Sequence, residues 1–165
     1  MAQNNSSDQK LQESTIPPLK VLNQYIKDLS YENPNPEKSF QDSTEAPEMN
    51  LNLDIQAKNL AEGIFDITLH LTAEAKRSDY SLFIIELQYT GIFQLNNVPQ
   101  ESVHPLLMIE GPRLLFPTIR HVVANLTREG AFPTLNLESI DFVDLYRRQY
   151  IEPQQEQANG AKLDS

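Results

Sequence analysis

Apolar and polar residues alternate one by one in three segments of the chain, which is the spacing of a β-strand that buries one face. The segments are 49–57, 65–73 and 80–93. Their apolar positions are Met49, Leu51, Leu53, Ile55 and Ala57, then Phe65, Ile67, Leu69, Leu71 and Ala73, then Phe83, Ile85, Leu87 and Tyr89. Arg77-Ser78-Asp79 forms a short linker before the last segment, so we expect the last two segments to form an antiparallel hairpin.

A weaker alternation over residues 21–32 predicts another strand, the first in the chain. Its two sides are Tyr25, Leu29 and Tyr31 against Gln24, Asp28, Ser30 and Glu32. Asn33-Pro34-Asn35-Pro36 ends it, because proline has no N–H to donate and restricts the residue before it. A long connection to Pro47 follows, with Phe40 as its only large apolar residue.

Helical spacing appears in the second half of the chain. Apolar residues three or four apart predict an amphipathic helix over 114–129, with the buried stripe Leu115, Ile119, Val122 and Leu126. Gly130 is expected to end it in a left-handed cap, and Pro133 cannot continue it. The stretch 99–110 is less regular and suggests a short helix before Gly111-Pro112.

A second helix is predicted over residues 140–150, where Phe142, Leu145 and Tyr146 share one side. The hydroxyl of Ser139 is expected to cap its start. Four strands followed by two helices predict an α+β protein, a four-stranded antiparallel sheet with two helices packed on one face. We expect one domain over 18–152, with disordered polar tails over 1–17 and 153–165.

The outward-facing strand positions are mostly acidic, against two lysines: Asp28, Glu32, Asp54, Asp66, Glu74 and Glu86, with Lys58 and Lys76. Leu82 and Ile84 are expected to form a small apolar spot on this face. The whole chain has 13 Lys and Arg against 23 Asp and Glu, a net charge of −10. Such a surface repels nucleic acid and anionic membranes, and it fits either a solvated face or docking of a basic partner.

No motif for catalysis or cofactor binding stands out. GxxxxGK[ST] and GxGxxG are absent, and His70, His104 and His121 lie on separate predicted elements without the spacing of metal ligands. The chain has no cysteine, so thiolate chemistry and disulfides are excluded. We expect no enzyme, no metal and no cofactor. Because the chain shows no secretory signal and no apolar span, we also expect a cytoplasmic protein.

Three separated stretches carry a resemblance to a known family. LLFPTIRHVVANLTREGAFPTLNLESIDF at 114–142, GIFQL at 91–95 and YIKDLSYENPNP at 25–36 together resemble the SecB family of bacterial protein-export chaperones. The resemblance covers about residues 19–150. It implies a homotetramer, a dimer of dimers, that holds unfolded precursor proteins without ATP and passes them to the SecA translocation motor.

The resemblance also implies roles for particular residues. SecA would dock on Asp28, Glu32, Ile84 and Glu86, three of which belong to the acidic face derived above. Clients would bind in an apolar groove of Phe40, Met49, Leu51, Leu53, Phe142, Leu145 and Tyr146. The stripe of the long helix, Leu115, Ile119, Val122 and Leu126, would lie at the oligomer interface. Relatives often carry tryptophan in the connection before the second strand, whereas this chain has none and offers Phe40.

Two other classes remain open from the sequence. A SecB-like chaperone dedicated to a toxin–antitoxin partner would use the same groove for one client. A small α+β hydrolase or transferase would need a catalytic group that the motifs do not supply.

Overall fold

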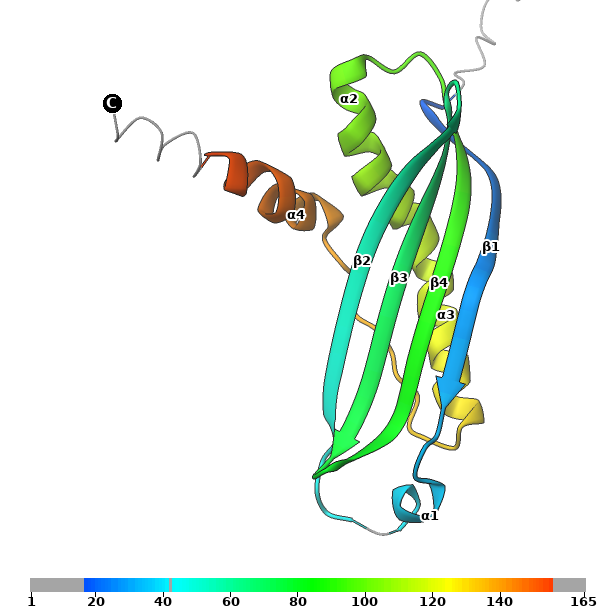
Figure 1. The fold of residues 1–165 in the computed structure, drawn as a ribbon, viewed down its shortest axis with the longest axis vertical. Helices are drawn as coiled ribbons and strands as arrows, with labels where there is room; N and C mark the ends of the chain where they lie inside the picture. Colours follow the sequence, from blue (N-terminus) through cyan, green and yellow to red (C-terminus); the bar gives the residue numbers. More distant parts are fainter. Residues whose placement is uncertain (1–16, 42, 156–165) are drawn as a thin grey trace, which may run out of the picture.

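The computed structural model describes residues 17–41 and 43–155. Its sheet contains β1 (Leu19–Glu32), β2 (Glu48–Ala61), β3 (Ile64–Arg77) and β4 (Tyr80–Leu95) in the order β1-β4-β3-β2, with every neighbouring pair antiparallel (Figure 1). β3 and β4 are therefore central, and β1 and β2 form the edges. Ile67, Leu69, Ile85 and Leu87 are fully buried on the inner face, as their alternation predicts.

One continuous helical rod covers the inner face of the sheet. It is built from α2 (Gln100–Pro105), the π-helical turn η1 (Leu106–Glu110) and α3 (Gly111–Glu129) (Figure 1). The short helix expected over 99–110 therefore runs without interruption into the long helix. The π turn lies directly before Pro112, where the missing N–H interrupts the usual ladder of helical hydrogen bonds, so the rod passes through the proline.

The rod lies very close to the central strands. A Cβ on Gly111 would stand 2.1 Å from Cδ1 of Ile67, so any larger residue would force the Ile67 side chain to shift. Farther along, Leu115, Ile119 and Val123 of α3 are completely buried against the sheet. This contact forms most of the hydrophobic core together with the inner faces of β3 and β4.

The end of α3 differs from its prediction. Gly130 has a φ of −77°, which is not left-handed, whereas Ala131 has a φ of 62°. Glycine is required at 130 for a steric reason: a Cβ there would lie 1.7 Å from the Tyr31 hydroxyl. The left-handed residue that turns the chain is therefore Ala131.

The last helix consists of α4 (Phe142–Tyr146) and the π-helical turn η2 (Arg147–Ile151), and residues 152–155 continue it. Its cap is Asp141, whose carboxylate accepts hydrogen bonds from the backbone N–H groups of Val143 and Asp144 at 3.0 Å each, so the prediction of Ser139 is wrong. Residues 153–155 were expected in a disordered tail but are helical. Residues 1–16 and 156–165 of the predicted tails lie outside the described residues.

Bulges change two predicted strand faces. In β1 the register shifts between Val21 and Asn23 and again between Ile26 and Asp28. Tyr25 therefore pairs with Thr90 of the outer face, whereas Leu29 and Tyr31 pair with inner-face residues of β4. In β4 a register shift at Leu82 takes this residue out of the alternation and into the core, 3% exposed, so it does not form the expected outer spot with Ile84.

The fold confirms the α+β class, with a four-stranded antiparallel sheet and two helical segments. Of the two helical segments, only the rod covers the sheet. α4 instead lies beside the rod, packed against η1, and is directed away from the sheet (Figure 1). A short α1 (Pro36–Ser39), which the alternation does not predict, lies in the connection between β1 and β2.

Candidate functional site

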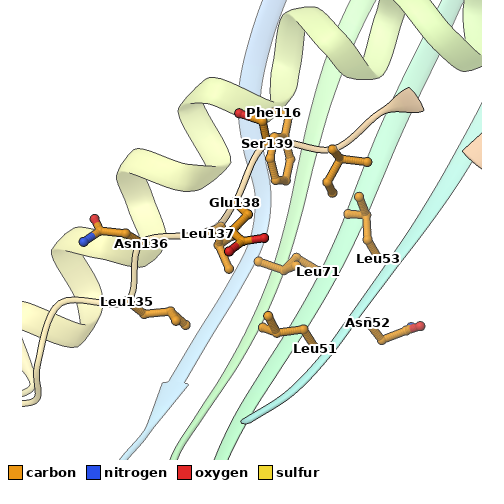
Figure 2. A pocket seen from close by; sticks show the side chains of 11 residues that line it. Leu51, Asn52, Leu53, Leu71, Phe116, Leu135, Asn136, Leu137, Glu138 and Ser139 are labelled. Atoms are coloured by element: carbon orange, nitrogen blue, oxygen red, sulfur yellow. The ribbon is translucent and has the colours of Figure 1, made fainter. Parts of the chain in front are cut away.

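An apolar groove of about 520 Å³ lies on the inner face of the sheet, between its β2 edge and the connection that follows α3. β2 supplies Leu51 and Leu53, β3 supplies Leu71, and α3 supplies Phe116 (Figure 2). The opposite wall is the chain between the two helical segments, with Leu135, Asn136, Leu137, Glu138, Ser139 and Ile140. The groove is open because β2 is an edge strand and half of the Leu51 side chain is exposed.

A buried threonine fixes the outer wall of the groove. The Thr127 hydroxyl accepts a hydrogen bond from the backbone N–H of Leu135 at 3.0 Å and donates to the carbonyl oxygen of Val123 at 3.1 Å. Thr127 is fully buried. This link ties the wall to the last turn of α3, so the groove is preformed on the scaffold of the helical rod.

The structure brings only part of the predicted groove set together. Leu51 and Leu53 line the groove, and Phe142 supports it from behind, packed edge-on against Phe116 at 5.7 Å between ring centroids. Phe40 lies elsewhere, stacked on Phe132 at 5.4 Å. Met49 and Leu145 pack against the core outside the groove lining, and Tyr146 contacts His104.

The wall Leu135 to Ile140 and Phe116 were missed in the sequence. A signal was present, since Leu135 and Leu137 alternate with Asn136 and Glu138 at the period of an extended chain. The alternation covers only four residues and forms no strand in the structure, so it carries little weight without the neighbouring sheet.

The predicted docking residues lie side by side on the outer face of the sheet. Glu32 of β1 pairs with Ile84 of β4, and Ser30 pairs with Glu86, with Asp28 two residues farther along β1. Asp28, Glu32 and Glu86 are exposed and Ile84 is half-buried. Across β4, Glu74 of β3 pairs with Ile84, so a further carboxylate lies in the same row.

Glu74 is held in its charged form. The Ser81 hydroxyl donates to its carboxylate at 2.5 Å and Lys76 lies 3.4 Å away. The hydrogen bond from Ser81, and next the charge of Lys76, hold the pKa of the Glu74 carboxyl below its ordinary value. Glu74 therefore stays anionic to lower pH than a free glutamate.

The predicted interface stripe is only partly available to another subunit. Leu115 and Ile119 are 0% exposed in the single chain, so their assignment to a subunit contact is wrong: they already pack against the sheet of their own chain. Val122 and Leu126 are half-buried, and the nearby Leu114 is 47% exposed. A contact made by α3 has to use this outer side.

Other site types find little support in residues 17–41 and 43–155. No group of three His, Cys, Asp or Glu side chains there is arranged to hold a metal ion. His70, His104 and His121 lie apart on β3, α2 and α3. In the same part of the chain, no helix is long and apolar enough to cross a membrane.

Fold and surfaces define the class first: an α+β binding protein with an apolar groove on one side of its sheet and an acidic outer face on the other. Residues 12–153 match the family described as preprotein translocase subunit SecB. The chain is 47% identical to the protein-export protein SecB of Rhodopseudomonas palustris over 87% of this chain and 92% of the relative. It is 46% identical to that of Afipia carboxidovorans, over 91% and 93%.

The chain belongs to the SecB family of protein-export chaperones, which are not enzymes. A solved SecB-like chaperone of Mycobacterium tuberculosis, in complex with a peptide from an antitoxin, has the same fold. It has a TM-score of 0.60 at 13% identity, covering 74% of this chain and 91% of that one.

Proposed function

We propose that this chaperone holds unfolded precursor proteins in the groove of Leu51, Leu53, Leu71 and Phe116, without ATP, and delivers them to the SecA motor in the cytoplasm. The observation that carries the proposal is an open apolar groove along an edge strand. A folded client has already buried its apolar side chains, so only a non-native chain offers the groove an extended apolar segment.

One groove binds weakly. Fixing an extended client costs roughly 1–2 kcal/mol per residue. Burying ~400 Å² of apolar surface returns about 10 kcal/mol at about 25 cal/mol per Å². For about eight residues the two nearly cancel. Useful affinity then requires several grooves on one long client, which supports a homotetramer built as a dimer of dimers.

Holding is tested by suppression of the aggregation of an unfolded precursor in the absence of nucleotide. The wild type is expected to suppress it, and Leu51→Asp to suppress it less, because a carboxylate in the groove is desolvated by the client. Leu60→Asp is the matched control, since Leu60 is 47% exposed on the same strand but outside the groove. Equal loss in both variants, or no suppression by the wild type, contradicts the proposal.

Docking of SecA is proposed on the outer face, through Asp28, Glu32, Ile84 and Glu86, with a basic segment of the motor as the complementary surface. Glu86→Lys reverses one charge at the centre of this set and should weaken SecA binding by about tenfold at low salt. Client holding should be unchanged, because the groove is on the other side of the sheet. Glu101→Lys on α2 gives the same charge change away from the face.

A dedicated antitoxin client is the second candidate, favoured by the fold shared with the antitoxin-bound chaperone of Mycobacterium tuberculosis. Export is the better supported function, because the relatives at 46–47% identity are protein-export proteins. Competition for the groove decides between the two. A general holdase exchanges one unfolded precursor for another, whereas a dedicated chaperone prefers a single peptide by orders of magnitude.

A further inference from the structure

The last helix is attached to the rest of the molecule in an unusual way. It is reached through residues 133–141, which have no regular secondary structure, and it extends away from the sheet (Figure 1). Its Asp141 cap and its ion pairs, Arg147 and Arg148 with Asp144 and Arg147 with Glu152, all lie within the segment itself. The cap and the ion pairs of the segment therefore do not attach it to the rest of the molecule.

Two kinds of contact hold this unit in place. One is apolar: Phe142 packs edge-on against Phe116, and Leu145 packs against the core. The other is polar: Nδ1 of His104 and the Tyr146 hydroxyl are 2.9 Å apart. Within residues 17–41 and 43–155, this is the single side-chain hydrogen bond between the last helix and the body, and no ion pair joins them.

Aromatic packing reinforces the bond. The His104 ring lies 5.5 Å from the ring of Tyr146 and 4.9 Å from that of Tyr150, edge-on to the latter. Tyr146 and Tyr150 are one helical turn apart and lie 5.0 Å from each other, so both rings meet the same histidine. α2, which carries His104, belongs to the rigid rod.

We propose that His104, Tyr146 and Tyr150 form a latch that holds the last helix against α2 and thereby sets how long a bound chain stays in the groove. The link to the groove is Phe142, the first residue of the helix, because it supports the groove residue Phe116. When the latch opens, the helix swings on the connection and the groove loses that support. This inference rests on the proposed function only where it concerns the residence time of a bound client.

The latch is tested first without any client, by amide hydrogen exchange in the full chain. Tyr146→Phe keeps the ring and removes the hydroxyl, so exchange over residues 143–151 should become about two- to tenfold faster, as expected for loss of one hydrogen bond. Exchange in α3 should not change. Tyr150→Phe is the matched control, because it removes a hydroxyl from the same helix that makes no side-chain hydrogen bond among the described residues.

A double mutant separates the bond from a general loosening. His104→Ala should also accelerate exchange over residues 143–151, and adding Tyr146→Phe to it should change nothing further, because the partner of the hydroxyl is already gone. Equal exchange in Tyr146→Phe and Tyr150→Phe, or an additive effect in the double mutant, overturns the latch.

The groove readout is dissociation of a fluorescently labelled unfolded precursor. It should be about two- to tenfold faster from Tyr146→Phe than from Tyr150→Phe, following the change in exchange. If hydrogen exchange becomes faster but dissociation of the precursor does not, the latch does not set how long a bound chain stays in the groove. If the wild type binds no unfolded chain, the proposed function fails instead, and the exchange comparison still tests the latch.

Discussion

The hydroxyl of Tyr31 lies against the C-terminal end of α3, where Gly130 makes room for it. This oxygen is buried and has no hydrogen-bond partner in the described part of the chain. The Tyr31 side chain is thus the reason for a glycine at position 130, whereas the sequence suggests a left-handed cap there. Two predictions at the residue scale follow from this contact.

The first compares substitutions at neighbouring positions. Gly130→Ala should lower the free energy of unfolding by about 1–3 kcal/mol, because its Cβ overlaps the Tyr31 hydroxyl. Ala131→Gly should raise it by up to about 1 kcal/mol, because alanine is strained at a φ of 62°. Urea unfolding measures both. A left-handed cap at 130 would give the opposite ranking.

The second concerns alkaline stability. Burial raises the pKa of the Tyr31 hydroxyl above its ordinary value. The folded state therefore keeps a proton that the unfolded chain loses above about pH 10, so this contribution is complete below that pH and is lost as pH rises through the folded pKa. Tyr31→Phe should flatten the fall of the melting temperature between pH 9 and 11. Tyr25→Phe on the exposed part of β1 is the control.

At the scale of elements, the groove wall depends on one hydroxyl. Thr127→Val removes the acceptor of the Leu135 N–H and should lower the free energy of unfolding by about 1–3 kcal/mol, the cost of a buried donor left unpaired. Aggregation suppression should fall with it, because Leu135 lines the groove. Thr127→Ser keeps the hydroxyl and should retain most of both. Melting curves and the aggregation assay check the pair.

The elements also show what the sequence can specify. Strict alternation assigned the side chains of β2 and β3 to the correct faces from Met49 to Ala73. It succeeded because every second side chain of these strands faces the core side of the sheet. β1 could not be predicted in the same way: two bulges reverse its faces around Tyr25, and nothing in its composition marks them. The π turn before Gly111-Pro112, which joins the two predicted helical stretches into one rod, could not be predicted from helical spacing.

The same limits apply to the candidate sites. Asp28 and Glu32 share the outer face with Glu86 as alternation predicts, because both lie beyond the second bulge of β1. The groove is lined by segments far apart in the chain, such as those of Leu51 and Leu137, and alternation cannot predict which segments come together. Leu115 and Ile119 were correctly identified as buried, but periodicity does not tell burial within a chain from burial between chains.

At the scale of the whole molecule, we expect light scattering to give the mass of four chains of 18.8 kDa. Leu114→Asp should shift this mass downward, since Leu114 is exposed on the outer side of α3 in the single chain. The melting temperature of the subunit should change little for the same reason. Ile151→Asp, at a similarly exposed site on the last helix, is the control. A monomer at working concentration contradicts the avidity argument for client holding.

β2 and β3 each serve both sides of the sheet. Leu51 and Leu53 enter the groove, and the intervening Asn52 pairs with Thr72, which is itself opposite Glu86 of the outer face. A substitution can therefore tune one surface without touching the other. An insertion or deletion of one residue cannot, because it exchanges the faces of the strand and damages both at once. We therefore expect these strands to tolerate substitutions on one face at a time far better than a change in length.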